Sequence, residues 1–338
     1  MKILGIESSC DDTSIAIIDS NKNIISNEVL SQTEIHREFN GIVPELAARN
    51  HIIQIDKVLK KCLRKSKLSL SDIDLFTATA GPGLVGGLIV GLTFAKTLAL
   101  ATKKPFVAVN HLEGHALLPR LTENVKYPYL TLLISGGHSN FYFIKNINDY
   151  IFLGGTRDDA LGEAFDKVAK TLGLEYPGGP NLEALALSGN ENLLNLPLPL
   201  INSKDLDLSF SGLKTAAVKL EKENKKKADI AACFQKTVSK ILCSKITQAI
   251  EYCNKKFSCY KSVIISGGVA ANSYLRNDIK KTIISKKKIC AFPPVKLCTD
   301  NAVMIAWAGY ERYNNGLKST LKHRAKPKWP LEERKYLS

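Results

Sequence analysis

The 338-residue sequence has no run approaching the ~18 to 20 uninterrupted apolar residues that a membrane-spanning helix needs. Its opening stretch, MKILGIESSCDD, carries one lysine and then acidic residues, unlike a signal peptide or an arginine-rich transit peptide. The eight cysteines form no C-x-x-C pair, which argues against a zinc ribbon and a thioredoxin-type redox site. We therefore expect a cytoplasmic protein with reduced cysteines and no membrane association.

Positive charge, by contrast, is in excess, with 47 Lys and Arg against 32 Asp and Glu and a net charge of +15. This balance suggests a polyanionic partner such as nucleic acid. Lysine, isoleucine and asparagine are all abundant, as in proteins from A/T-rich genomes, so composition alone is a second explanation. The 45% hydrophobic fraction is ordinary for a globular protein, and the length predicts roughly two domains.

Residues 1–19 and 129–145 share one plan: an apolar run, a turn rich in Gly, Ser or Asp, and a second apolar run. The plan predicts two β-hairpins. Each is followed by alternating helical and extended patterns, so we expect an α/β fold of two duplicated lobes. The predicted parts are an N-terminal lobe of residues 1–110 plus about 300–325, a C-terminal lobe of residues 111–299 with inserted helical segments, and a tail of residues 326–338.

Glycine-rich turns provide candidate phosphate sites. Gly81–Gly86 matches G-x-G-x-x-G but lacks the acidic residue expected about 20 positions later, so close packing explains these glycines better. The hairpin turns GIESSCDDTS and ISGGHS could cradle anionic oxygens with their backbone N–H groups. Asp11 and Asp12 could hold water, a metal or a base edge there, and Ser266–Asn272 could form a wall for the adenosine of a nucleotide clamped between lobes.

His111 and His115 are separated by four residues, so on a helix both side chains can point at one metal ion. A zinc protease would need H-E-x-x-H, but Leu112 follows the first histidine and the acid is Glu113, off the histidine face. Asp300 is a candidate third ligand. The competing interpretations are helix capping or packing for the histidines and simple N-capping for Asp300.

With these pieces in place, the chain resembles the TsaD-type tRNA N6-threonylcarbamoyladenosine synthase family, once labelled O-sialoglycoprotein endopeptidase. The resemblance spans residues 5–313 through an ordered set of motifs: GIESSCDDTS, GIVPELAARNH, AGPGLVGGLIVG, VNHLEGH, LLISGGHS, GGTRDDALGEAFDKVAKTLGL, YPGGP, FSGLKTA, ISGGVAANSYLR and CTDNAVMIAWAGYERY. It implies the fold of actin, Hsp70-type ATPases and sugar kinases, with a nucleotide cleft between the lobes.

The resemblance also implies an activity: transfer of threonylcarbamoyl from threonylcarbamoyl-AMP to N6 of the tRNA adenosine 3′ of the anticodon. It implies an iron-type divalent metal on residues matching His111, His115 and Asp300. The ion expected is Fe²⁺, and Zn²⁺ is the alternative. Some relatives have a tyrosine that reaches the metal where this chain has Ile134. The implied substrate contacts are Ile134, Ser135, Gly136, Gly137, His138, Asp166, Gly179, Glu183 and Asn272.

The chemistry needs a proton acceptor for the adenosine amine, and the candidates are Asp11, Asp12 and His138. The implied partners are tRNA, a paralogous TsaB-type subunit, a TsaE-type P-loop ATPase and a TsaC-type enzyme that supplies the adenylate. Three alternatives remain open at this point: a metal-dependent glycoprotein endopeptidase, a small-molecule kinase of the same fold, and a non-enzymatic nucleotide-binding scaffold in a tRNA-modifying complex.

Overall fold

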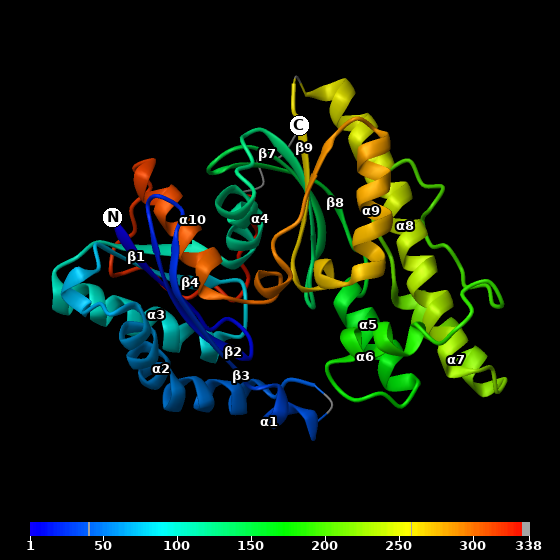
Figure 1. Cartoon of the computed structure of the whole chain (residues 1–338), viewed down its shortest axis with the longest axis horizontal. Helices are drawn as coiled ribbons and strands as arrows, with labels where there is room; N and C mark the ends of the chain where they lie inside the picture. The colour runs from blue at the N-terminus through cyan, green and yellow to red at the C-terminus, as the bar shows by residue number, and fades with distance from the viewer. Residues whose placement is uncertain (40, 258, 333–338) are drawn as a thin grey trace. The chain divides into compact units, whose positions relative to one another are not determined.

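The computed structural model describes residues 1–39, 41–257 and 259–332. The chain forms two compact units, each drawn in Figure 1. Unit 1 contains Met1–Asn124, Ile147–Asp149 and Asp300–Ser338, and unit 2 contains Val125–Asn146 and Tyr150–Thr299.

The division differs from the predicted lobes at residues 111–124, which belong to unit 1 because helix α4 (His111–Thr122) packs against α10 (Ala302–Asn314). The predicted tail, residues 326–338, also counts with unit 1. Its backbone donates from Lys326 N to Ala80 O at 2.7 Å, while residues 333–338 lie outside the described part.

Unit 1 is built on a five-stranded sheet whose central strand is the apolar start of the chain. The strand order is β3 (Ile24–Ser31), β2 (Asp12–Asp19), β1 (Lys2–Glu7), β4 (Leu75–Gly81) and β5 (Phe106–Asn110). β1 pairs antiparallel with β2, as the predicted hairpin requires, and parallel with β4, which in turn pairs parallel with β5.

Helices cover both faces of this sheet. Neighbouring side chains of β1 point to opposite faces, so each face needs its own covering layer. Ile6 packs in the core that α2 (Pro44–Ser66) and α3 (Val85–Thr102) complete. Gly5 faces α10, and a Cβ there would overlap the backbone of Ala302. The missing side chain lets α10 lie directly on the strands. The short helix α1 (Thr33–Arg37) and a 3-10 turn at Leu70–Asp72 complete the unit within the described residues.

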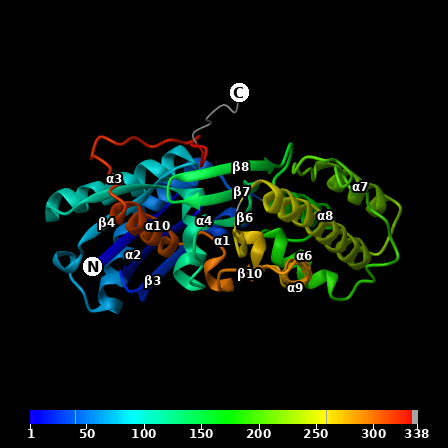
Figure 2. The ribbon, with the colours of Figure 1, turned by 90° about the horizontal axis from the view of Figure 1, so that it is seen from above.

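Unit 2 repeats the strand plan of unit 1. Its sheet has the order β8 (Asp149–Gly155), β7 (Ser139–Asn146), β6 (Tyr129–Ile134), β9 (Ser262–Ser266) and β10 (Ile289–Ala291). β6 pairs antiparallel with β7 and parallel with β9, and β9 pairs parallel with β10. Figure 2 shows β6, β7 and β8 side by side. The predicted duplication is therefore confirmed at the level of strand pairing.

The helices of unit 2 supply most of its core. They are α5 (Leu161–Thr171), α6 (Gly178–Ala186), α7 (Ser211–Lys222), α8 (Lys227–Lys256) and α9 (Ser273–Ser285), with 3-10 turns at Gly268–Ala271 and Val295–Leu297. Buried residues of α8 such as Phe234 and Ile241 join Phe165 and Phe210 in one apolar cluster. These helices correspond to the inserted helical segments that the sequence predicts in the C-terminal lobe.

Helix α3 has the length and apolar composition of a membrane span, with a mean hydropathy of 1.6 over its 18 residues. It packs on α2 and β4, and its Leu88, Leu92 and Ala95 are buried in unit 1. A core helix passes the same test, so this helix is weak evidence for a membrane span.

Candidate metal centre and substrate turns

The two histidines are positioned by the start of α4. Asn110 ends strand β5 and caps the helix, because its Oδ1 accepts from Leu112 N at 2.9 Å and Glu113 N at 3.4 Å. Its Nδ2 donates to Trp329 O at 3.0 Å, so the C-terminal segment fixes the cap in turn. Asn110, and not a histidine, therefore caps α4. His111 and His115 lie on the same side of the helix, with their ring centroids 4.9 Å apart.

Asp300 completes a group of three potential metal ligands. Its Oδ1 lies 3.1 Å from His115 Nε2 and 3.5 Å from His111 Nε2, and one ligand atom from each residue falls within 4.8 Å of the others. Bonds of about 2.0 to 2.2 Å to nitrogen and oxygen separate neighbouring ligand atoms by about 3 to 3.5 Å, so the two distances from Asp300 to the histidines fit a first-row divalent ion. The cap of α10 is Asn301, whose side chain accepts from Met304 N, so N-capping does not explain Asp300.

Glu7 and Ser9 orient the first histidine from the opposite side. His111 Nδ1 lies 3.1 Å from both Glu7 Oε2 and Ser9 Oγ, which favours a proton on Nδ1 and presents Nε2 toward Asp300. Burial would lower the pKa of His111, but the charges of Asp300 and Glu7 outweigh it and raise that pKa to about 9. A metal ion would displace the Nε2 proton. Glu7 is not among the site residues predicted from the sequence. The feature that could have indicated it is a carboxylate at the end of an otherwise apolar strand.

Glu113 has a structural role that excludes it from metal chemistry. Its side chain is fully buried, and both carboxylate oxygens accept from Arg312 Nη1, at 3.0 and 3.1 Å. A second ion pair, Arg120 Nε to Glu311 Oε1 at 2.7 Å, joins the same two helices. A metalloprotease needs a carboxylate on the metal-bound water. The endopeptidase alternative therefore lacks the base that its sequence motif would have supplied.

Asp11 and Asp12 form a carboxylate pair where β2 begins. Burial raises the pKa of Asp12, and the charges of Asp11 and Asp300 raise it further, to about 7. Burial and the charge of Asp300 also raise the pKa of Asp11. A carboxylate that titrates near neutral pH suits proton transfer, since the ideal pKa of a general base lies near the working pH. The raised pKa of Asp12 therefore supports this residue as a candidate proton acceptor.

In unit 2 the predicted ISGGH turn closes the β6–β7 hairpin. Ser135 N donates to His138 O at 2.8 Å, and His138 N donates to Ser135 Oγ at 3.2 Å. A Cβ added at Gly136 or Gly137 would meet no atom within 4 Å, so packing does not demand glycine at either position. Ile134, in contrast, is fully buried in the apolar core, so its side chain cannot contact a substrate. Of this residue, only the backbone borders the turn.

Three of the remaining predicted substrate residues of unit 2 accept hydrogen bonds from backbone N–H groups at the starts of helices. Asp166 Oδ1 accepts from Gly178 N at 2.8 Å at the start of α6. Glu183 Oε1 accepts from Ser273 N at 2.8 Å. Asn272 caps α9 through Leu275 N. Asn272 also donates to Gln235 at 2.9 Å, a partner that the sequence did not reveal. Gly179 has open space around its missing Cβ.

The glycines after β4 show the close packing that the sequence favoured over a dinucleotide site. Gly83 has φ +155°, and a Cβ there would overlap Ser9 O, while one at Gly86 would press on Ala48 Cβ. The turn thus lets α3 approach α2 and the first hairpin.

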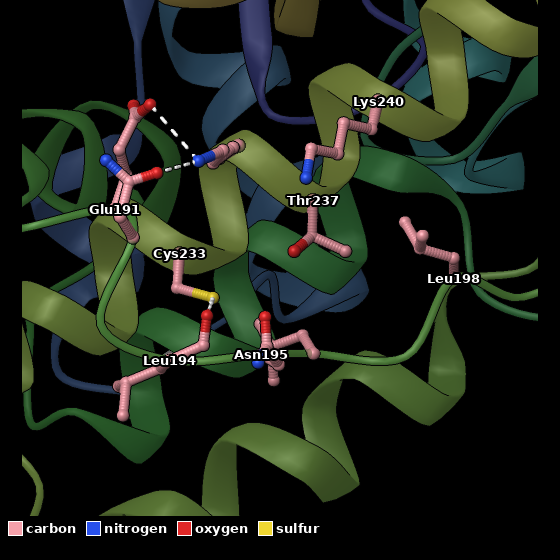
Figure 3. Close-up of a pocket in the computed structure, with 10 residues that line it drawn as sticks. Glu191, Leu194, Asn195, Leu198, Cys233, Thr237 and Lys240 are labelled. Atoms are coloured by element: carbon pink, nitrogen blue, oxygen red, sulfur yellow. Dashed lines mark hydrogen bonds and ion pairs between the residues drawn. The ribbon is translucent and has the colours of Figure 1, made fainter.

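A cavity of about 290 Å³ lies elsewhere in unit 2, between α8 and residues 191–198 (Figure 3). Lys236 pairs with Glu191 and Asn192 there, and Cys233 Sγ donates to Leu194 O at 2.9 Å. None of the predicted site residues lines it.

Comparison with known proteins gives a consistent result. The family TsaD, described as tRNA N6-adenosine threonylcarbamoyltransferase, matches residues 23–307. Relatives of that name from Rickettsia rickettsii (strain Sheila Smith) and Rickettsia canadensis (strain McKiel) are each 50% identical, over 98% of this chain and 99% of theirs.

Solved structures that share the fold include component A of (R)-2-hydroxyglutaryl-CoA dehydratase from Acidaminococcus fermentans. Its TM-score is 0.55 at 15% identity, covering 93% of this chain and 99% of that one. HypF from T. kodakarensis has a TM-score of 0.64 at 14% identity, covering 94% of this chain and 48% of that one. These neighbours have the actin, Hsp70 and sugar-kinase type of fold, which the family resemblance implied.

Proposed function

Because the chain belongs to the TsaD family of tRNA N6-adenosine threonylcarbamoyltransferases, it is a transferase that forms N6-threonylcarbamoyladenosine in tRNA, and we propose residue roles for that reaction. His111, His115 and Asp300 hold the divalent ion of this metal-dependent family. The donor is threonylcarbamoyl-AMP, and the acceptor is N6 of the adenosine 3′ of the anticodon.

The observation that carries this proposal is the geometry of the two histidines and the aspartate, with His111 held by Glu7 and Ser9. Two histidines and one carboxylate that leave positions open are typical of Fe(II) sites, so we assign Fe²⁺, with Zn²⁺ as the alternative. When bound, the ion would supply a Lewis acid for the carbamoyl carbonyl or a grip on the threonyl carboxylate.

The chain's own groups then have defined tasks. The exocyclic amine attacks the carbamoyl carbon, the N6–C bond forms, and the bond from that carbon to the phosphate oxygen breaks, releasing AMP. Asp12 takes the proton that the amine loses, with Asp11 beside it and His138 as the other candidate. In unit 2, the backbone N–H groups of Gly136 and Gly137 donate to anionic oxygens of the adenylate.

In unit 2 the adenylate is bound by the turn Ser135–His138, with Asp166, Gly179, Glu183 and Asn272 around it. The caps that Asp166, Glu183 and Asn272 make would hold the starts of α6 and α9 rigid next to the ligand. The open space at Gly136, Gly137 and Gly179 supports this assignment, because it lets a ligand approach the backbone closely.

Besides tRNA, the assigned partners are a paralogous TsaB-type subunit, a TsaE-type P-loop ATPase and a TsaC-type enzyme that supplies the adenylate, all in the cytoplasm. Support for a docked subunit comes from apolar side chains left exposed by more than half on the adjacent helices α2 and α3. They are Ile52, Ile53, Val85 and Ile89. Large apolar side chains left exposed on neighbouring helices are a feature of protein interfaces.

The test is transfer of labelled threonine into tRNA by the purified chain with its candidate partners, with and without chelator. The double variant His111→Ala/His115→Ala should abolish transfer and metal binding while adenylate binding stays measurable. His323→Ala, a histidine outside both sites, is the control and should remain active. Unchanged transfer in the double variant would favour the non-enzymatic scaffold.

A further inference from the structure

The positive charge of the chain is unevenly divided between the two units. Unit 2 has 25 Lys and Arg against 14 Asp and Glu, whereas unit 1 has 22 against 18. A lysine-rich composition alone would distribute the excess more evenly. The excess of lysine in unit 2 therefore needs an explanation that is specific to unit 2.

Much of this excess gathers where four elements of unit 2 meet. α8 ends, β9 begins, α9 ends and β10 begins at this place, and Figure 1 shows α8 and α9 running side by side. Lys286 Nζ lies 2.8 Å from Glu251 Oε1, and Ile289 N donates to Lys261 O at 2.9 Å, so the segments are in contact. The basic end of unit 2 comprises Lys255, Lys256, Lys261, Lys280, Lys281, Lys286, Lys287 and Lys288.

Only a small part of this charge is neutralised. Glu251 pairs with Lys286, and Asp278 lies 4.0 Å from Lys281. Among the described residues, no ion pair involves the remaining exposed lysines of the basic end: Lys255, Lys256, Lys261, Lys280 and Lys287. Like charges held together repel one another, which opposes folding. Such a cluster is typical of a surface that receives a polyanion.

Two simpler explanations cover only part of the cluster. β10 is an edge strand, and lysines next to an edge prevent strand pairing between molecules, which could explain Lys286, Lys287 and Lys288. Lysines in the last turn of a helix stabilise its dipole, which could explain Lys255 and Lys256. Lys261 and Lys280 fit neither explanation.

Exposed apolar side chains lie among these lysines. Tyr252 is 40% exposed with Lys256 Nζ 5.5 Å from its ring centroid, and Ile284 and Ile289 are 55% and 60% exposed. Aromatic side chains within a basic surface are typical of proteins that bind RNA, because the ring contacts bases or sugars while the lysines contact phosphates.

The basic end is also remote from the substrate turns of unit 2. Strands β6 and β9 are parallel, and the turns at Ser135–His138 and Gly267–Ala271 follow their carboxyl ends. The basic end lies at the opposite, amino-terminal ends, about 17 Å away by the rise of a five-residue strand. A ligand that contacts both ends must be much larger than a nucleotide.

We propose that the basic end of unit 2 binds the phosphate backbone of tRNA at a distance from the acceptor adenosine. This inference rests on the proposed function, in which the turns of unit 2 bind the adenylate. The contact supplies affinity independent of sequence, because phosphates carry no base identity.

The test compares two triple variants of the full chain, assayed with its candidate partners. Lys255→Gln/Lys256→Gln/Lys261→Gln removes three charges from the basic end. The matched control is Lys225→Gln/Lys226→Gln/Lys227→Gln, which removes three charges from the α7–α8 junction, where Glu221, Glu223 and Asp229 flank them in the sequence. The tRNA dissociation constant is measured by fluorescence anisotropy at several salt concentrations.

Each lost phosphate contact lowers the slope of log affinity against log salt by about 0.7 to 0.9, so the basic-end variant should lose about 2 units of slope. We expect about 10- to 100-fold weaker binding at low salt, and less than a twofold change in the control. Unfolding melts at low salt should show the basic-end variant at least as stable as the parent chain, because repulsion is relieved.

Equal slopes for the parent chain and the basic-end variant would overturn the inference, as would equal losses in the two triple variants. Failure of the parent chain to bind tRNA or to transfer threonylcarbamoyl would instead overturn the proposed function. The two failures are thus distinguishable in one set of measurements.

Discussion

Unit 1 and unit 2 share one strand plan but use the turn after their first hairpin strand in different ways. In unit 1 the turn is packed: Glu7, Ser8 and Ser9 are buried, and Glu7 and Ser9 hold His111. In unit 2 the corresponding turn has Gly136 and Gly137 exposed, with open space around them. The duplicated fold therefore carries a charged candidate metal centre in one copy and an open backbone surface in the other.

The largest effect should come from removing the carboxylate of the metal centre. Asp300→Asn keeps the size of the side chain but removes the charge opposite His111 and His115. Loss of a direct ligand should weaken metal binding by at least about 100-fold, more than loss of a supporting group does. Co²⁺ titration followed by absorbance measures it. Adenylate binding in unit 2 should stay within about twofold, and a parallel loss there would contradict the separation of roles.

A large stability effect should follow from removing Glu113, since Arg312 would be left largely buried without its partner. Glu113→Ala should lower the free energy of unfolding by about 3 kcal/mol, measured by urea denaturation. The double variant Glu113→Met/Arg312→Met should recover most of that loss, because no unpaired charge remains. An unchanged stability in Glu113→Ala would reopen the endopeptidase interpretation.

The contrast between packed and open turns can be tested with two glycines. A Cβ at Gly87 would overlap the carbonyl oxygen of Ser8 in unit 1, so Gly87→Ala should destabilise the chain by about 2 kcal/mol. Gly136→Ala should change the stability by less than about 0.5 kcal/mol. It should instead weaken adenylate binding by about tenfold, or 1.4 kcal/mol, as measured by calorimetry. The reverse pattern would show that the turn of unit 2 is structural.

The smallest effect concerns the two ends of β2 and depends on pH. Asp12 has a folded pKa of about 7, above its ordinary value of 3.8, so the folded state binds more protons and stability falls as pH rises between these values. The full shift corresponds to about 4 kcal/mol, and screening by water at this partly exposed residue should reduce it to about 2 kcal/mol. Asp12→Asn should therefore be more stable than the parent chain by about 2 kcal/mol at pH 8, and the difference should vanish below pH 4.

Asp19, at the other end of β2, is the control, because its pKa shifts in the opposite direction from that of Asp12. Burial raises its pKa, but the hydrogen bonds from Asn23 and Asn21 together outweigh burial and lower the pKa. Asp19→Asn should thus lose stability above pH 4, and this loss should disappear as the pH falls below the folded pKa. Urea denaturation across pH 3 to 8 measures both variants. Bound metal should reduce the gain in Asp12→Asn, because a cation offsets the repulsion from Asp300.

Local sequence patterns were enough to predict both β-hairpins and to single out the candidate metal ligands. Apolar runs around Gly, Ser and Asp turns predicted both hairpins, and the four-residue spacing of His111 and His115 predicted a shared face. The boundary at residue 110 differed, because the packing of α4 on α10 joins segments almost 190 residues apart. No local pattern contains such a contact.

The sequence by itself determined the duplicated α/β plan, the identity of the candidate ligands and the excess of positive charge, because each depends on residue type and spacing. Only the tertiary structure decided what the polar groups do. It assigned the caps to Asn110 and Asn301, which leaves His111, His115 and Asp300 together. It also paired Glu113 with Arg312 and buried Ile134. The physical reason is that a buried polar group must find a partner, and that partner is chosen by packing rather than by sequence distance.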